Sequence, residues 1–364
     1  SYVLGGRGME VVYDDENLIS YMNAAVGVTP DRPILVDRFL NHALECEADA
    51  ICDGEEAYIP AVMEHIELAG IHSGDSACVL PSVNISEEHL ATIRDYTKRI
   101  AEAMHVRGLM NMQYAIENDV VYVLEANPRA SRTVPLVSKI CNIQMVPIAT
   151  EVITMPLTGR PSPIPELEEK SYEYYGVKEA VLPFNMFPEV DPVLGPEMRS
   201  TGEVLGLAKT FGEAFFKAQE ATQTVLPKGG KVLITVSNKD KDELPELARA
   251  LKDAGFDIYA TEGSAELIEA EGIAVERVKK LHEGRPNLVD LITNGEMDLV
   301  INTPAATGES AEDDSYIRKT AIKAHTPYFT TMAAALASAK GIKTVETSEE
   351  GGIASLQEIH AKIS

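Results

Sequence analysis

The chain has 364 residues, a formal net charge of −25 and 45% hydrophobic residues. Its length predicts two domains, and its hydrophobic fraction is that of an ordinary globular protein. The strong acidity argues against a nucleic-acid partner, because such proteins carry a basic surface. No apolar run is long enough to predict a membrane span. The four cysteines form no Cys-x-x-Cys pair, which is typical of a reducing, cytoplasmic compartment.

Residues 1 to about 155 have the pattern of an α+β unit. Strands are expected at 44–52 and 57–64, and a helix is expected from Ser86, which can cap its first turn, to about residue 105. A β-hairpin follows. Prolines at 156–165 and again at 181–206 predict extended, irregular segments. The chain begins without Met inside what looks like a strand and a glycine loop, so we expect it to be a piece of a longer protein.

The hairpin between Gly108 and Arg132 carries the most informative side chains. Strand side chains alternate between two faces, and the apolar residues here occupy the even positions. A loop with an odd number of residues around 117–119 would place Gln113, Glu125 and Asn127 on one face. A two-residue turn would instead put Gln113 opposite residue 124, so we predict the odd loop.

One carboxylate and two amides form a set of oxygen ligands that suits Mg2+ or Mn2+. Arg129 and Arg132 follow directly, and guanidinium groups bind phosphate in a bidentate manner. The alternative is an exposed hairpin with solvated polar ends.

From Lys231 onward, strands and helices alternate. Strands are expected at 232–236, 257–260, 274–277, 298–302 and 328–330, which predicts a doubly wound parallel sheet. Such sheets bind ligands beyond the carboxyl ends of their strands. Polar residues at those ends are Thr235, Thr261, Ser264, Lys280, Asn302, Thr303, Thr330 and Thr331. They can cradle a phosphate or simply cap helices, and both alternatives remain open.

Several long runs resemble the large chain of carbamoyl-phosphate synthase. They include Gly-Ile-His-Ser-Gly-Asp-Ser-Ala-Cys at 70–78, Glu-Ala-Asn-Pro-Arg-Ala-Ser-Arg-Thr-Val-Pro at 125–135, Gly-Pro-Glu-Met-Arg-Ser-Thr-Gly-Glu-Val at 195–204 and His-Glu-Gly-Arg-Pro at 282–286. The resemblance covers essentially the whole chain. It implies a mixed α+β and α/β fold in three parts: the later part of an ATP-grasp domain (1–157), an extended connecting segment (158–226) and an allosteric domain like methylglyoxal synthase (227–364).

The resemblance also implies an activity, which is the ATP-dependent phosphorylation of carbamate to carbamoyl phosphate. The implied enzyme is a glutamine-hydrolysing ligase that feeds pyrimidine and arginine biosynthesis. Its implied cofactors are ATP, Mg2+ or Mn2+, and K+. Its implied partners are a glutaminase small subunit, in an oligomer of the heterodimer, and the effectors UMP, IMP and ornithine. We expect the isolated chain to be inactive, and the alternative is an effector-binding module without catalysis.

The functional residues of that family fall on positions of this sequence as follows. Its metal ligands fall on Gln113, Glu125 and Asn127, of which the first two also contact the nucleotide, and its catalytic phosphate-binding arginines fall on Arg129 and Arg132. Its other nucleotide contacts fall on Arg38, Leu40, Glu45, Gly70, Ile71, His72 and Ser73. Its ornithine site falls on Glu67, Asp75 and Glu179, with Thr330 and Thr331 opposite. Its nucleotide-effector pocket falls on Thr235, Lys241, Thr261, Ser264, Lys280, Asn302 and Thr303.

Two features of the last domain depart from that pattern. Pro304 stands where a hydroxyl should line the effector phosphate, and the stretch 305–314 is acidic, which disfavours phosphate there. A methylglyoxal synthase activity is expected even less than nucleotide regulation, because it needs a carboxylate at the phosphate pocket. No aspartate follows Ile301 closely in the sequence.

Overall fold

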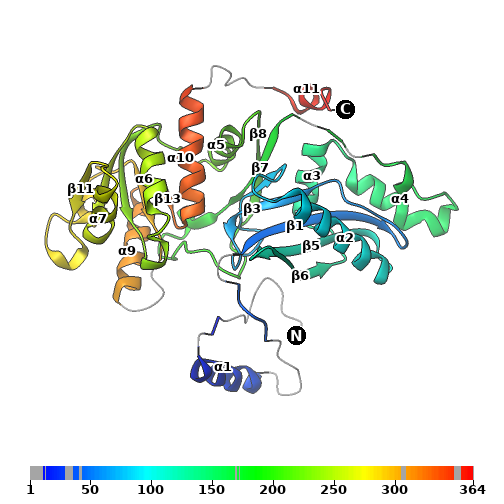
Figure 1. Ribbon diagram of the computed structural model, residues 1–364, viewed down its shortest axis with the longest axis horizontal. Helices are drawn as coiled ribbons and strands as arrows, with labels where there is room; N and C mark the ends of the chain where they lie inside the picture. The colour runs from blue at the N-terminus through cyan, green and yellow to red at the C-terminus, as the bar shows by residue number, and fades with distance from the viewer. Residues whose placement is uncertain are drawn as a thin grey trace.

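The computed structural model describes residues 11–12, 14–28, 36–40, 43–168, 170–171, 173–304, 309–347 and 354–363. These residues form two β-sheets with helices packed on them, and the two units meet where α5 (Phe211–Ala221) crosses α10 (Met332–Thr347) (Figure 1). Two peripheral helices, α1 (Asp15–Val28) and α11 (Leu356–His360), lie near the ends of the chain.

The first sheet is antiparallel, with eight strands. Its order is β6-β5-β1-β3-β4-β7-β8, and β2 pairs with β1. The strands are β1 (Leu44–Asp53), β2 (Ala57–Tyr58), β3 (Val62–Leu68), β4 (Cys78–Leu80), β5 (Arg107–Glu117), β6 (Val120–Asn127), β7 (Tyr175–Val181) and β8 (Gly202–Ala208).

Two expectations for this sheet need correction. The strand expected at 57–64 is split into β2 and β3, because Pro60 lies between them and has no N–H for a ladder. The segment 181–206, expected to be irregular, ends in β8, which pairs with β7 along its whole length. Only the part between these strands is irregular, apart from the 3-10 turn Pro183–Met186, because the prolines gather there.

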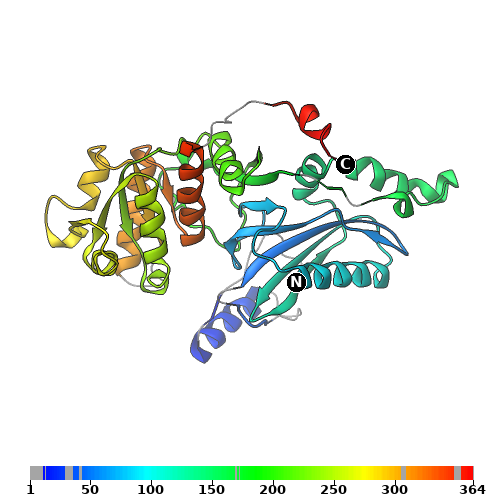
Figure 2. The same ribbon diagram turned by 45° about the horizontal axis from the view of Figure 1, so that its top comes forward.

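Helices cover both faces of the first sheet (Figure 2). On one face α2 (Glu87–Ala103) packs over Cys46, Ala48 and Ala50 of β1. As predicted, the Ser86 side chain caps α2 by accepting the His89 N–H. On the other face α3 (Thr133–Cys141) and α4 (Met145–Thr158) pack over the outer part of the same strands.

Among the described residues no single helix is both long and apolar enough to cross a membrane. Helices α3 and α4 together reach the required length and composition, but the pair bends by 110°.

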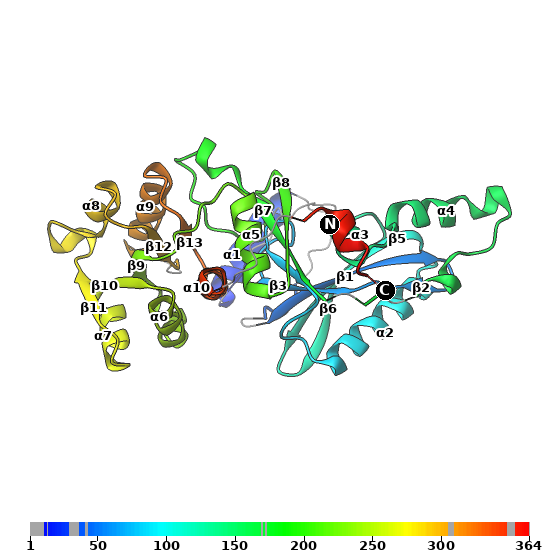
Figure 3. The ribbon, with the colours of Figure 1, turned by 90° about the horizontal axis from the view of Figure 1, so that it is seen from above.

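The second sheet confirms the predicted doubly wound arrangement. Its five strands are parallel, in the order β11-β10-β9-β12-β13. The strands are β9 (Gly230–Thr235), β10 (Phe256–Thr261), β11 (Val275–Val278), β12 (Leu299–Asn302) and β13 (Tyr328–Phe329). One face packs against α6 (Leu244–Asp253), α7 (Glu262–Ala270) and α10, and the other against α8 (Leu288–Thr293) and α9 (Glu309–Lys323) (Figure 3).

Small residues allow close contact between the two units. A Cβ atom at Gly341 of α10 would lie 2.8 Å from the carbonyl oxygen of Gly212 in α5. An ion pair also joins the units, because the buried Arg318 of α9 donates to both carboxylate oxygens of the half-buried Asp191, at 2.8 and 2.7 Å.

Candidate functional site

The hairpin formed by β5 and β6 turns differently from the prediction. Its turn has two residues, Asn118 and Asp119, with φ angles of 51° and 65°. Two consecutive positive φ angles are typical of the tight hairpin turn, and Asn and Asp adopt them readily. The predicted odd loop is therefore wrong.

The predicted face is nevertheless shared, because a β-bulge shifts the register beyond the turn. Tyr114 pairs with Val123 but Gln113 pairs with Glu125, so Leu124 is an extra residue on β6. Gln113 and Glu125 therefore lie opposite each other and share a face of the sheet, as expected.

Two rows of polar side chains run across β1, β5 and β6 on this face. Glu47 pairs with Gln113, which pairs with Glu125. In the next row Asp49 pairs with Asn111, which pairs with Asn127. We call the side chains of these two rows, together with His65 of β3, the polar face.

The inner half of the polar face was missed by the sequence reasoning. Glu47, Asp49, His65 and Asn111 are all at most 3% exposed. A signal was present, because Glu45, Glu47 and Asp49 alternate with small apolar residues along one strand. Three carboxylates on one face of a central strand indicate a functional face rather than a solvated one.

Contacts within the polar face orient the expected metal ligands. Gln113 Nε2 donates to Ser73 Oγ at 3.0 Å and to Glu47 Oε1 at 3.4 Å, which turns its carbonyl oxygen away from both. Asn127 Nδ2 is buried without a hydrogen-bond partner among the described residues. Rotation of this amide by half a turn would place its oxygen there. With the Glu125 carboxylate, these oxygens fit a hard divalent cation.

Within the described residues no group of three His, Cys, Asp or Glu side chains is arranged to hold a metal ion. A cation bound at this face would therefore depend on amide oxygens, as the predicted ligand set requires.

Burial and neighbouring charges set the protonation of the inner carboxylates. His65 Nε2 lies 3.6 Å from Glu47 Oε1, and its Nδ1 lies 4.0 Å from Glu45 Oε1. Burial alone would raise the pKa of Glu47, but its contacts with His65 lower that pKa to about 2. Burial likewise opposes a charged His65, yet Cys78, Glu47 and Glu45 raise its pKa well above 6.5. Glu47 and His65 thus form a buried ion pair beside Gln113.

The two arginines lie at the end of this face on exposed backbone. Arg132 immediately precedes α3, and its guanidinium donates to Ser200 Oγ at 2.9 Å. Arg129 Nη1 donates to the adjacent carbonyl of Ala130 at 3.0 Å. Both side chains are exposed.

The other expected nucleotide contacts gather along the first sheet. Arg38 forms an ion pair with Glu117 at 3.6 Å, at the end of the hairpin. Leu40 packs with Ala43 and Ala115, and Glu45 is buried in β1 beside Ala115. The turn after β3 contains Gly70 to Ser73, with Gly70 at a φ of 109° that favours glycine. Through Ser73 this turn reaches Gln113, whereas Ile71 and His72 are half-buried beside it.

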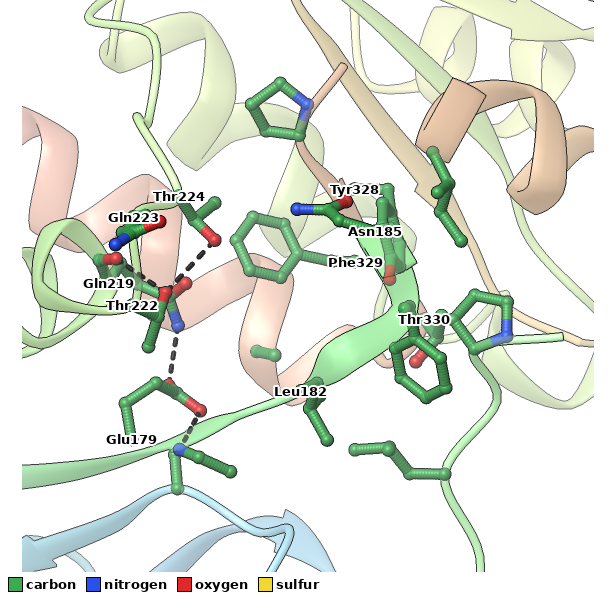
Figure 4. Close-up of a pocket in the computed structure, with 18 of the residues that line it drawn as sticks. Glu179, Leu182, Asn185, Gln219, Thr222, Gln223, Thr224, Tyr328, Phe329 and Thr330 are labelled. Carbon is green, nitrogen blue, oxygen red and sulfur yellow. Dashed lines mark hydrogen bonds between the residues drawn. The ribbon is translucent and has the colours of Figure 1, made fainter. Parts of the chain in front are cut away.

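A cavity of about 330 Å³ lies between the two units (Figure 4). Its walls bring together Glu67, Asp75, Glu179 and Thr330. Gln219 donates to Glu179 at 2.6 Å, and burial raises the pKa of Glu179 to about 7. Burial also raises the pKa of Glu67, which a hydrogen bond from Thr331 opposes.

The acids of this cavity differ in availability. Both carboxylate oxygens of Asp75 accept backbone N–H groups, from Arg199 at 2.7 Å and Ser200 at 2.9 Å. Glu67 Oε2 has no hydrogen-bond partner among the described residues. Asp75 therefore holds the cavity wall. Both oxygens of Glu179 also accept hydrogen bonds, from Gln219 and from the Ala180 N–H at 3.0 Å, so Glu67 has the acid oxygen of this cavity that lacks a partner among the described residues.

The polar residues at the carboxyl ends of the second sheet are only partly available. The Asn302 side chain is fully buried, receives a hydrogen bond from Arg318 at 2.7 Å and donates one to Asp314 at 2.9 Å. Thr303 Oγ1 accepts the Ser237 N–H at 2.9 Å. No aspartate follows Ile301 closely in the sequence, but the structure brings Asp314 of α9 to the end of β12.

The remaining expected effector residues lie around the starts of the following helices. Thr261 is the N-cap residue of α7, and Ser264 is buried in its first turn. A side chain at Gly263 would come within 3.2 Å of Lys241 Nζ, so this ammonium lies over the start of α7. Thr235 ends β9, and Lys280 starts the 3-10 turn Leu281–Glu283 after β11.

Comparisons with known proteins identify the family. Residues 1–155 match the model described as the carbamoyl-phosphate synthase L chain, ATP binding domain, and residues 243–330 match the MGS-like domain. The chain is 46% identical over 363 residues to the carbamoyl phosphate synthase large chain of Methanosarcina barkeri, covering 100% of this chain and 90% of that one. The chain belongs to the carbamoyl phosphate synthase large chain family.

Other relatives in this family show which part of the large chain is present. The C-terminal section of the large chain of Aquifex aeolicus is 45% identical over 99% of this chain and 70% of that one. The chain spans only about a third of several longer relatives, such as 34% of the large chain of Methanosarcina acetivorans. The predicted order, an ATP-grasp unit followed by an MGS-like domain, is confirmed.

Among solved structures, the biotin carboxylase of Campylobacter jejuni is 15% identical over 49% of this chain and 40% of that one, with a TM-score of 0.41.

Proposed function

We propose that this chain carries the metal-holding and phosphate-binding half of a site that phosphorylates carbamate with ATP to give carbamoyl phosphate. The observation that carries the proposal is the bulged register that places Gln113 opposite Glu125. Asn127 and then Arg129 and Arg132 follow Glu125 directly along the chain. ATP with Mg2+ or Mn2+ is the proposed cofactor pair, and K+ is a further proposed ion.

The chemistry explains why these residue types belong together. Carbamate and the γ-phosphate are both anions, so they repel each other until their charge is neutralised. A divalent cation, when bound, supplies charge neutralisation at the phosphate oxygens. Arg129 and Arg132 orient the transferred phosphate, and Ser73 and Glu47 fix Gln113 before substrate arrives.

The whole enzyme extends beyond this chain. We propose that a glutaminase small subunit supplies ammonia, that the product feeds pyrimidine and arginine biosynthesis, and that the heterodimer forms an oligomer. The division at 157 and 226 remains our proposal. The strands β7 and β8 of the connecting segment complete the first sheet, and α5 packs against them.

The test replaces Glu125 by Gln in the complete enzyme and measures carbamoyl phosphate formed from ATP and carbamate. Loss of one carboxylate from the ligand set is expected to lower kcat by roughly a hundredfold or more. The matched control is Asp119→Asn, because that carboxylate lies on the same hairpin with its side chain 96% exposed. Wild-type activity in Glu125→Gln would end the proposal.

We infer a second function, effector binding, from the cavity between the units. Glu67 and Glu179 would bind the ammonium groups of a small diamino acid such as ornithine, and Thr330 and Thr331 face them from the second unit. An ammonium ligand favours ionised Glu179, so its affinity should rise as pH rises through about 7. Titration calorimetry of the chain with ornithine, compared with its Glu179→Gln variant, tests this, and no heat with ornithine would refute it.

Nucleotide effectors are a separate part of the same proposal. Lys241 and the start of α7 suit a phosphate group, whereas Asp314 near Asn302 repels one. UMP and IMP should therefore bind at the α7 side of the sheet edge. Calorimetry with each nucleotide on wild type and Lys241→Ala checks this, with loss of heat expected in the variant.

A further inference from the structure

The turn that carries the two arginines folds back onto one buried carboxylate of the sheet. We call residues 128–133 the arginine turn, because Arg129 and Arg132 belong to it. It leaves the sheet after Asn127 at the end of β6. Asp49 lies in the same row as Asn127, two strands away, and is 1% exposed.

Both oxygens of Asp49 hold this turn. Ser131 Oγ donates to Asp49 Oδ1 at 2.7 Å, and Thr133 Oγ1 lies 2.6 Å from Asp49 Oδ2. Asn111 Nδ2, between Asp49 and Asn127 in the row, donates to Oδ1 at 3.0 Å. Ser131 and Thr133 flank Arg132 in the chain, so Asp49 fixes the backbone on both sides of that arginine.

The number of hydrogens shared by Asp49, Ser131 and Thr133 indicates which protonation state of Asp49 satisfies all of their hydrogen bonds. Ser131 Oγ and Thr133 Oγ1 are also 2.8 Å apart, so the two hydroxyls and the carboxyl form a ring of three short contacts. Two hydroxyls supply two hydrogens, and three hydrogen bonds need three. A proton on Asp49 supplies the third, and burial, assisted by the charge of Glu47, raises the pKa of Asp49 to about 6, so this form predominates below about pH 6.

We propose that Asp49 is a positioning residue for phosphate transfer, which acts by holding the arginine turn through Ser131 and Thr133 in a ring of hydrogen bonds. This inference rests on the proposed function. A displacement of about 1 Å in a catalytic group can cost on the order of a hundredfold in rate. Release of the turn should therefore lower kcat for carbamoyl phosphate formation.

Asparagine at position 49 provides the decisive variant. Its amide donates one hydrogen and accepts another, as a protonated aspartic acid does, so it can replace Asp49 in the ring. Asp49→Asn should keep kcat within about threefold of wild type, whereas Asp49→Ala should lose about a hundredfold. Asp53→Ala is the control, because Asp53 ends the same strand but binds Ser162 and the loop at Glu55 and Glu56.

A second variant removes the two hydroxyl groups of the ring instead of the carboxyl group. Ser131→Ala combined with Thr133→Val removes the donors, and it should lower kcat as much as Asp49→Ala. Combining all three substitutions should lower kcat little more than either set alone, because both sets remove the same ring of hydrogen bonds. This set carries the test if Asp49→Ala fails to fold.

The outcomes separate this inference from the function on which it rests. Full activity in Asp49→Ala or in the Ser131/Thr133 double variant overturns the inference, and so does an Asp49→Asn variant as poor as Asp49→Ala. If Glu125→Gln loses activity in the same assays, the proposed function survives that result. If Glu125→Gln keeps its activity, the proposed function itself fails.

Discussion

The polar face of the first sheet and the carboxyl edge of the second sheet contain similar polar residues, but these residues differ in their exposure and hydrogen bonding. On the polar face, Glu125 and the arginines reach solvent, while Glu47, Asp49 and His65 lie buried behind them. At the edge of the second sheet, Asn302 and Thr303 are themselves buried and hydrogen-bonded within the protein.

This difference teaches that a polar residue at a ligand-binding position need not contact a ligand. Asn302 connects Asp314, Arg318 and, through Arg318, Asp191 of the first unit. Its place at the end of a parallel strand predicts a ligand contact, but its hydrogen bonds indicate a structural connection between the units. In the proposed function the first sheet binds the ligand, whereas the hydrogen bonds of Asn302 and Arg318 hold the two units together.

Breaking the connection at Arg318 should have the largest effect on stability. Arg318→Met leaves the half-buried Asp191 and the buried Asn302 without the guanidinium that binds both, and the loss of this charged partner costs about 3 kcal/mol. Urea unfolding of the chain measures this loss. Lys323→Met on the same helix is the control, because Lys323 is 53% exposed in its pair with Glu189 and should matter little. Equal stability of the two variants would contradict the structural role of Asn302 and Arg318.

Removing Arg132 tests the binding role of the polar face. Arg132→Ala in the complete enzyme should lower kcat about a hundredfold, or about 2.7 kcal/mol, because a donor to the transferred phosphate is lost. Arg160→Ala is a suitable control, since Arg160 is exposed in a pair with Glu151 at 3.7 Å. If both variants keep wild-type kcat, Arg132 serves only its hydrogen bond to Ser200.

The two sheets also differ in how much of them the sequence could predict. The second sheet was predicted strand by strand, because each strand is followed by a helix with clear periodicity. Strand β8 was missed because the prolines between Val181 and Gly202 suggested irregular structure throughout. That Gln113 and Glu125 share a face was predicted for the wrong reason, since the bulge at Leu124 replaces the odd loop.

The contacts in the inner part of the site could not be predicted from sequence, because they join distant segments. Asp49 binds Ser131 and Thr133, more than 80 residues away along the chain. Asn302 meets Asp314 only because α9 returns across the sheet edge. Periodicity shows which side of a strand a residue faces, but not which distant loop packs against it.

Glu179, in the cavity between the two units, should make the stability of the chain depend on pH. Its pKa in the folded protein, about 7, lies above its ordinary value of 4.5. The protonated form therefore contributes stability that is fully present below about pH 4.5 and is lost as pH rises through about 7. Because the Glu179 side chain is partly exposed, solvent screens its charge, and the loss in free energy of unfolding amounts to about 2 kcal/mol.

Unfolding of the chain by urea at about pH 5 and about pH 8 measures this loss, and Glu179→Gln should remove the part due to Glu179. Glu220→Gln, an exposed neighbour on α5, should leave the pH dependence unchanged. An identical pH profile for wild type and Glu179→Gln would mean that the cavity does not raise the pKa of this carboxyl.

Substitution at the contact between Gly212 and Gly341 should change the free energy of unfolding least, but the sign of that change is informative. Alanine is normally favoured over glycine inside a helix by about 1 kcal/mol, so Gly341→Ala would stabilise α10 if the helix stood alone. At the crossing with α5, however, the new Cβ would lie 2.8 Å from the Gly212 carbonyl oxygen, and backbone must move. Such overpacking costs more than the gain in helix propensity, so a net loss of about 1 kcal/mol is expected in urea unfolding. Gly195→Ala, where the added Cβ meets no atom within 4 Å, is the control. A stabilised Gly341→Ala variant would show that the two units do not pack closely here, and would weaken every inference that depends on contacts between them.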